Sequence, residues 1–151
     1  MDLVNIIDRE CCSVLQEKTK TEVIIELTDR LVGRDNLDIE SLKKELFYRE
    51  QLMSTGIGLG LAVPHVRFKG VKSPVVIAGV QPEGIADYES LDGEPVKIVI
   101  MIIVGEAQHK EHIRLLSMIV GRLKNAELRT ALVNAESGDE IYSLLTGEAG
   151  E

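Results

Sequence analysis

Two of the three histidines in this 151-residue chain stand where their side chains could carry out reversible chemistry. His65 ends a glycine-rich segment closed by Pro64, and His112 falls in the first turn of an expected helix, on its inward face. A neutral imidazole is nucleophilic near pH 7, because its ordinary pKa is about 6.5. Such a ring can carry a phosphoryl group when the protein fixes its tautomer and neutralises the phosphoryl oxygens.

Neutralising those oxygens needs donors that are close by. The N-terminus of a helix offers free N–H groups to an anion, and His112 lies where such an anion would sit. Arg49 is the candidate guanidinium, a forked donor that is always charged.

Each of the three candidates also has a plainer interpretation, and spacing alone leaves both open. His65 could be a loop histidine bonded to backbone, and His112 a core-edge histidine with both nitrogens satisfied. Arg49 could be a cation that interacts with the C-terminus of a helix. We expect His109 to be solvated and Glu111 to be a first-turn acid favoured by the helix dipole.

The elements before the histidines are expected to be two helices. Thr19 and Glu22 form a capping-box pattern that predicts the first, with Gly33 as its stop and apolar residues at helical spacing: Val23, Ile24, Leu27 and Leu31. The second is predicted over 39–50, with a stripe of Ile39, Leu42 and Leu46 that Arg49 continues.

The glycine-rich segment 56–65 is the most unusual stretch of the chain. Glycines at 56, 58 and 60 free the backbone for turns or close approach, and 61–63 is expected to be extended. Pro64 should end the ladder there. The spacing differs from the dinucleotide-binding fingerprint, so a nucleotide site is not expected.

Beyond this segment, residues 75–80 and 96–104 are predicted to be buried strands, the second central in a sheet covered on both faces. Asp92-Gly93 indicates a turn before it.

A third helix is predicted from about Lys110, with one face formed by His112, Leu115, Leu116, Ile119 and Leu123. A short helix over 127–133 and a last one from Ser137 through Leu145 follow. The tail from about Gly147 is expected to be loose.

Alternating helices and strands favour an α/β fold in one domain over 1–151. The formal net charge of -8, without any basic run, argues against nucleic-acid binding. The adjacent Cys11 and Cys12 are interpreted as small hydrophobes. The N-terminus does not look like a signal peptide, and the longest apolar run, 98–105, is too short to span a bilayer. We therefore expect a cytoplasmic protein.

The segment 49–65, REQLMSTGIGLGLAVPH, resembles the active-site signature of the fructose/mannitol-type enzyme IIA domains of the bacterial phosphotransferase system. The segments 111–116, EHIRLL, and 92–96, DGEPV, are similar to further parts of that family. The resemblance covers nearly the whole chain, from Leu3 to about Leu145. One departure is Gly105, where the family usually has a proline after the buried strand.

The resemblance implies an α/β sandwich with a mixed, mainly parallel central sheet and helices on both faces. It implies that His65 accepts a phosphoryl group from an HPr-like carrier, while His112 and Arg49 stabilise its charge. His65 would then donate to a cysteine of an enzyme IIB partner or keep the phosphoryl group as a regulatory mark. Neither a metal nor a cofactor is implied.

The family has sugar-specific members and nitrogen-regulatory members, and the resemblance at residues 3–7 and 54–58 favours the regulatory kind. A hypothesis of another class is a regulatory binding module that is never phosphorylated. A histidine-based metal enzyme is the third interpretation, and it fits least because no cysteine or carboxylate ligands cluster near the histidines in the sequence.

Overall fold

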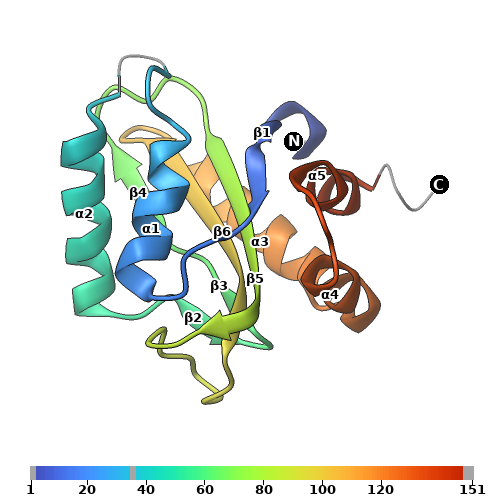
Figure 1. Ribbon diagram of the computed structural model, residues 1–151. Helices are drawn as coiled ribbons and strands as arrows, with labels where there is room; N and C mark the ends of the chain where they lie inside the picture. Colours follow the sequence, from blue (N-terminus) through green and yellow to red (C-terminus); the bar gives the residue numbers. More distant parts are fainter. Residues whose placement is uncertain (1–2, 35–36, 148–151) are drawn as a thin grey trace.

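The computed structural model describes residues 3–34 and 37–147, which form one mixed sheet with helices on both faces (Figure 1). The expected loose tail, beyond Gly147 itself, lies outside these residues. In chain order the elements are a 3-10 turn Leu3–Asn5, β1 Ile7–Val14, α1 Lys20–Asp29, α2 Ile39–Leu52, β2 Gly56–Gly58, β3 Leu61–Ala62, β4 His65–Phe68, β5 Val75–Ile85, β6 Val96–Gly105, α3 His109–Leu123, α4 Ala126–Val133 and α5 Gly138–Thr146.

The sheet has the strand order β1-β5-β6-β3-β2, and β4 also pairs with β6. Three of the pairings within the described residues are parallel, β1 with β5 and β6 with both β3 and β4. The β5–β6 and β2–β3 pairings are antiparallel, and β5–β6 is the longest ladder. The prediction of an α/β fold with a mixed sheet is thus confirmed. The longest strand pairing in this sheet, β5 with β6, is antiparallel.

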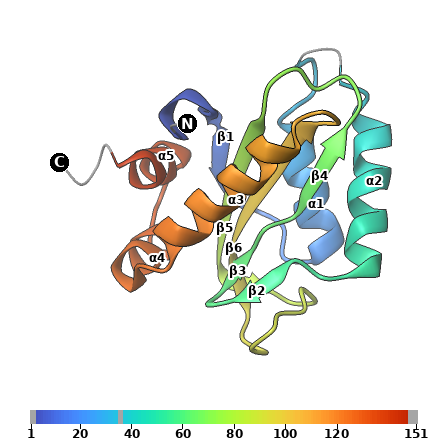
Figure 2. The ribbon, with the colours of Figure 1, turned by 180° about the vertical axis from the view of Figure 1, so that it is seen from behind.

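β6 is the central strand, as its sequence predicts. It is apolar at nearly every position because it is covered twice, and residues 98–104 are at most 1% exposed. Helices α1 and α2 cover one face of the sheet, and α3, α4 and α5 cover the other (Figures 1 and 2). Each face has its own apolar core, and alternate residues of β6 contribute to the two.

The helix starts follow the capping signals. The Thr19 hydroxyl accepts from the Glu22 backbone N–H, and the Ser137 hydroxyl accepts from that of Glu140. Helix α1 ends at Asp29, earlier than the predicted stop at Gly33, although Leu31 is still fully buried.

Several details of the sequence-based description were wrong or missing: strands β2 and β4 were not predicted, and β5 continues to Ile85 rather than ending at residue 80. Arg49 does not continue the inward face of α2: it is exposed, and Glu50 is the buried residue one turn after Leu46. Strand β1 was not predicted, because charges at 8–10 interrupt its apolar pattern. These charges are tolerated because β1 is an edge strand, and Arg9 and Glu10 face outward.

Candidate active site

His65 is the first residue of β4, and Pro64 explains how it gets there. The proline has no N–H, so the ladder along β6 breaks between β3 and β4. Its carbonyl still accepts from the Ile102 N–H at 2.9 Å, and pairing resumes at once with His65 opposite Ile102. Pro64 therefore interrupts the ladder as predicted, but it does not end the association with β6.

One hydrogen bond determines which ring nitrogen of His65 carries the hydrogen. The Nδ1 atom lies 2.9 Å from the carbonyl oxygen of Val63. A carbonyl can only accept, so Nδ1 carries the hydrogen and Nε2 keeps its lone pair. This arrangement fixes the neutral tautomer in which Nε2 is the ring nitrogen with a lone pair available.

His112 lies directly against His65. The two ring centroids are 4.7 Å apart at an interplanar angle of 45°, and His112 belongs to the first turns of α3. Burial lowers the pKa of His112, and electrostatic interactions with His65, Arg67, His109 and Arg49 lower it further. The ring is thus neutral near pH 7. Its Nε2 atom is buried without a hydrogen-bond partner among the described residues, which is an unusual state for such an atom.

Arg49 belongs to α2, on the other face of the sheet from α3, and borders the same site. It lines a hollow of about 350 Å³ together with His65, and the other lining residues are Leu52, Met53, Ser54, Thr55, Ile57, Val63 and Leu116. Its Nε lies 3.5 Å from Glu45 Oε1 in a half-exposed pair one helical turn away. Such surface pairs contribute little free energy, so an anion beside His65 can compete for the guanidinium.

Arg67 is a cation of this site that the sequence analysis missed. It is two residues after His65 on β4, so both side chains lie on the same face of the strand. Its Nη1 donates to His109 Nδ1 at 3.5 Å, so two strand residues face two residues of α3. His109 is exposed, as expected, but it has this contact. The alternation of side chains along a strand starting at His65 was the signal for Arg67.

The described residues contain no group of three or more histidine, cysteine, aspartate or glutamate side chains that could hold a metal ion. Two arginines, Arg49 and Arg67, lie near the histidines. Their guanidinium charges suit an anionic group and repel a metal cation.

The departure at Gly105 is accommodated locally. Its N–H donates to Gln108 Oε1 at 2.6 Å, a bond that a proline could not make. Gln108 in turn donates from Nε2 to the Lys72 carbonyl at 3.0 Å. The loop before α3 is thus held by a side chain, and His112 still meets His65.

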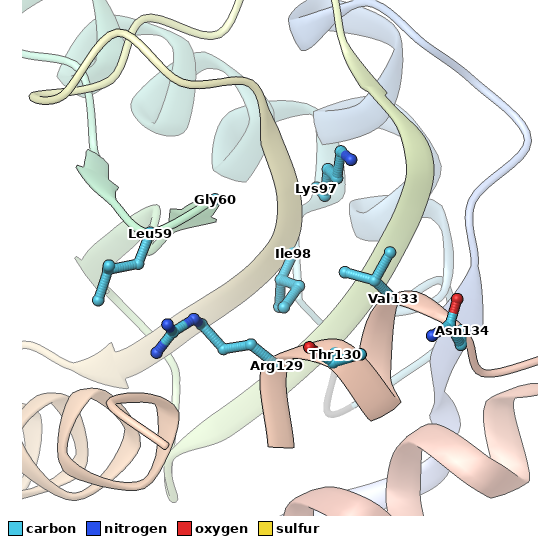
Figure 3. A pocket seen from close by; sticks show the side chains of 8 residues that line it. All are labelled: Leu59, Gly60, Lys97, Ile98, Arg129, Thr130, Val133 and Asn134. Carbon is cyan, nitrogen blue, oxygen red and sulfur yellow. The ribbon is translucent and has the colours of Figure 1, made fainter. Parts of the chain in front are cut away.

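A second hollow, of about 250 Å³, lies between α4 and the start of β6 and contains none of the histidines (Figure 3). Arg129 extends toward Leu59, whereas Lys97 points away from Arg129 (Figure 3). Arg129 Nη1 also donates to the carbonyls of Leu123 and Lys124 at the end of α3. The two cations do not converge, so the site at His65 remains the candidate active site.

Residues 5–147 match the model of the family described as "Phosphoenolpyruvate-dependent sugar phosphotransferase system, EIIA 2". The chain belongs to this family and is therefore a component of a phosphotransferase. Within the described residues, none of the helices combines the length and the apolar character needed to cross a membrane.

Relatives of both functional kinds are similar to the chain. It is 37% identical over 133 residues to the fructose-specific EIIABC component of Bacillus subtilis, covering 87% of the chain but only 21% of that longer protein. It is 34% identical over 124 residues to a nitrogen regulatory protein of Pseudomonas aeruginosa, covering 81% of the chain and 80% of that protein.

Solved structures agree with the fold. The nitrogen regulatory protein IIA-Ntr of Neisseria meningitidis superposes with a TM-score of 0.87 at 28% identity, over 95% of this chain and 99% of that one. IIA mannitol of Escherichia coli gives a TM-score of 0.71 at 26% identity, over 87% and 92%. The family resemblance in the sequence is thereby confirmed. These similarities do not distinguish the sugar-specific from the nitrogen-regulatory members of the family.

Proposed function

We propose that the protein is a phosphocarrier that accepts a phosphoryl group on His65 Nε2 from the phosphohistidine of an HPr-like protein. In this step the N–P bond of the donor breaks, its electron pair returns to the donor ring, and a new bond forms to His65 Nε2. The hydrogen bond from His65 Nδ1 to the Val63 carbonyl carries this proposal, because it leaves Nε2 free to attack.

Two neighbours take supporting roles in this proposal. Arg49 approaches the phosphoryl oxygens through the shared hollow and neutralises their charge. His112, in ring contact with His65, has an unpartnered Nε2 that can donate to a phosphoryl oxygen once it is protonated. No metal or cofactor is needed, because phosphoryl transfer between two histidines is mainly a matter of positioning and charge.

For the fate of the phosphoryl group we favour the nitrogen-regulatory kind of role, in which phosphorylation changes the binding of target proteins in the cytoplasm. The support is the TM-score of 0.87 with IIA-Ntr and the coverage of 80% of the Pseudomonas aeruginosa regulatory protein. The alternative is transfer to the cysteine of an enzyme IIB, in a sugar-specific system. It is supported by the 37% identity to the Bacillus subtilis fructose component and by the solved complex of mannitol IIA with phosphorylated IIB.

The test is intact-mass spectrometry after incubation with phosphoenolpyruvate, enzyme I and HPr. We expect an acid-labile phosphoryl adduct on the wild-type protein and none on His65→Ala. His112→Ala should still be labelled, but more slowly, since it keeps the acceptor. Undiminished labelling of His65→Ala would refute the assignment, and absence of label from the wild type would favour the unphosphorylated binding module.

A second experiment distinguishes the nitrogen-regulatory role from the sugar-specific role. Phosphorylated protein is mixed with a fructose- or mannitol-type enzyme IIB, and loss of the adduct is followed by mass. Rapid loss to the IIB cysteine supports the sugar-specific role. A persistent adduct, together with target binding that differs between the two phosphorylation states, supports the regulatory role.

A further inference from the structure

The last turn of α2 carries two adjacent residues with opposite surroundings. Arg49 lines the hollow that contains His65, whereas the side chain of Glu50 is only 4% exposed. A carboxylate buried to this extent is costly unless its oxygens are paired and hydrogen-bonded. Its partners therefore show what it holds in place.

Glu50 joins three segments of the chain. Its Oε1 accepts from Lys20 Nζ at 2.9 Å, and Lys20 is the first residue of α1. The same oxygen accepts from the Thr55 backbone N–H at 3.3 Å, and Oε2 accepts from the Thr55 hydroxyl at 2.5 Å. One carboxylate thus connects both helices of this face to the segment that leads into β2.

Tyr88 completes this buried cluster. Its hydroxyl lies 2.7 Å from Thr55 Oγ1, whose own hydrogen is directed to the Glu50 carboxylate, so Tyr88 is the donor. Burial, and then the charge of Glu50, raises the pKa of Tyr88, which keeps the phenol protonated. Lys20 Nζ also lies 4.6 Å from the centre of the Tyr88 ring. We call these four residues, Lys20, Glu50, Thr55 and Tyr88, the anchor cluster.

The anchor cluster continues into the active site through the backbone. The carbonyl of Thr55 accepts from the Val63 N–H at 3.0 Å, and the carbonyl of Val63 accepts from His65 Nδ1 at 2.9 Å. The side chain of Thr55 is fixed by Glu50 and its carbonyl is fixed by Val63. An unbroken series of hydrogen bonds therefore runs from the buried carboxylate to the ring that we assign as acceptor.

We propose that Glu50 and Thr55 are positioning residues for phosphoryl transfer, which hold the His65 ring in its Nδ1–H tautomer and hold Arg49 opposite it. This inference rests on the proposed role of His65 as acceptor. The Thr55 hydroxyl is engaged by Glu50 and Tyr88, so these side chains act on His65 through the backbone rather than by direct contact with its ring. Because Arg49 precedes Glu50 on the same helical turn, the carboxylate that is bonded to Thr55 also holds the backbone from which the guanidinium extends.

The main test compares Thr55→Val with Thr55→Ser. Valine keeps the size of threonine but removes the hydroxyl, so Glu50 loses a donor and Tyr88 loses an acceptor. We expect a fall of about tenfold in kcat for transfer from phosphorylated HPr, with little change in KM. Serine restores the hydroxyl and should return kcat to near the wild-type value.

Thr28→Val is the matched control, because it also removes a buried hydroxyl. Thr28 is fully buried in α1, and its Oγ1 donates to the Ile24 carbonyl at 2.9 Å. It has no contact with the anchor cluster among the hydrogen bonds of the described residues. If Thr28→Val lowers kcat as much as Thr55→Val does, the effect is general destabilisation and the proposal is wrong.

A second readout does not depend on phosphorylation. The ¹⁵N shifts of the His65 ring should report a single tautomer with hydrogen on Nδ1 in the wild type and in Thr28→Val. In Thr55→Val and Glu50→Gln we expect a mixture of tautomers. An unchanged single tautomer in both would overturn the proposal, whereas a wild type that shows the tautomer shift but takes no label would overturn only the role of His65 as acceptor.

Discussion

His112 is neutral near pH 7 because burial and nearby arginines lower its pKa, and the proposed phosphorylation of His65 should change this state. Burial and the nearby positive charges keep the pKa of His112 below its ordinary value of about 6.5. A phosphoryl group on His65 adds negative charge against the His112 ring, so the pKa of His112 should rise. NMR titration of the ring with and without phosphorylation measures this; an unchanged midpoint would argue against its proposed contact with the phosphoryl group.

The same depressed pKa predicts how stability depends on pH. An unfolded chain protonates His112 at about 6.5, whereas the folded protein protonates it only at lower pH. Between these two values the unfolded state binds more protons, so the free energy of unfolding falls as the pH is lowered through this window. Urea unfolding at pH 7.5 and 5.5 measures this. The free energy of unfolding should fall less between these two pH values for His112→Gln than for the wild type. An equal loss in both proteins would place the pH dependence elsewhere.

Arg67 should contribute through its charge. Its guanidinium lies 3.5 Å from His109 on α3 and lowers the pKa of His112. Arg67→Met is therefore expected to raise the pKa of His112 and to slow phosphoryl transfer by about three- to tenfold. Lys69→Met removes one positive charge from an exposed residue close by, beyond the end of β4, and serves as the control. Equal rates for the two variants would show that only the total charge matters.

At the scale of elements, the sequence predicts those features that depend on local chemistry. The caps at Thr19 and Ser137 and the doubly buried strand β6 are recognisable because a few residues determine each of them. The contact between Arg67 and His109 was not predictable, because it depends on how α3 packs against the sheet.

The inward residue of α2 was also beyond what periodicity could decide. Positions 49 and 50 both fall near the inward stripe, and an arginine near a helix C-terminus is a plausible member of it. Glu50 is the one that is buried, since Lys20 and Thr55 supply donors from other segments. Periodicity within a helix carries no information about such partners.

The β2–β3 hairpin tolerates no side chain at its first glycine. A Cβ on Gly56 would lie 2.1 Å from the Glu89 carbonyl oxygen, which is far inside contact distance. Gly56→Ala should therefore lower the free energy of unfolding by about 1–3 kcal/mol. Gly121 in α3 is the matched control, because a Cβ there meets nothing within 4 Å, and Gly121→Ala should raise stability by about 0.5–1 kcal/mol. Urea unfolding of both variants tests whether the free energy of unfolding falls for Gly56→Ala and rises for Gly121→Ala.

At the scale of the whole molecule, the sheet separates two apolar cores that share its strands. Ile77 and Tyr88 belong to the core under α1 and α2, whereas Ile100 and Tyr142 belong to the core under α3, α4 and α5. Each strand of the β5–β6 ladder contributes side chains to both cores. A strand cannot lose its packing on one face and keep its geometry on the other, so we predict that the cores unfold together and that residues 1–151 behave as one domain.

Tyrosine fluorescence can test this, since the chain has no tryptophan and only three tyrosines. With the exposed Tyr48 replaced by phenylalanine, Tyr142→Phe leaves Tyr88 as the probe of one core, and Tyr88→Phe leaves Tyr142 as the probe of the other. In each protein the fluorescence midpoint should coincide with the circular-dichroism midpoint. Ile77→Ala should then destabilise the protein by about 2–5 kcal/mol and shift the Tyr142 transition on the opposite face as well. A Tyr142 transition that stays in place would show two independent units, because a cavity in one core would then leave the other intact.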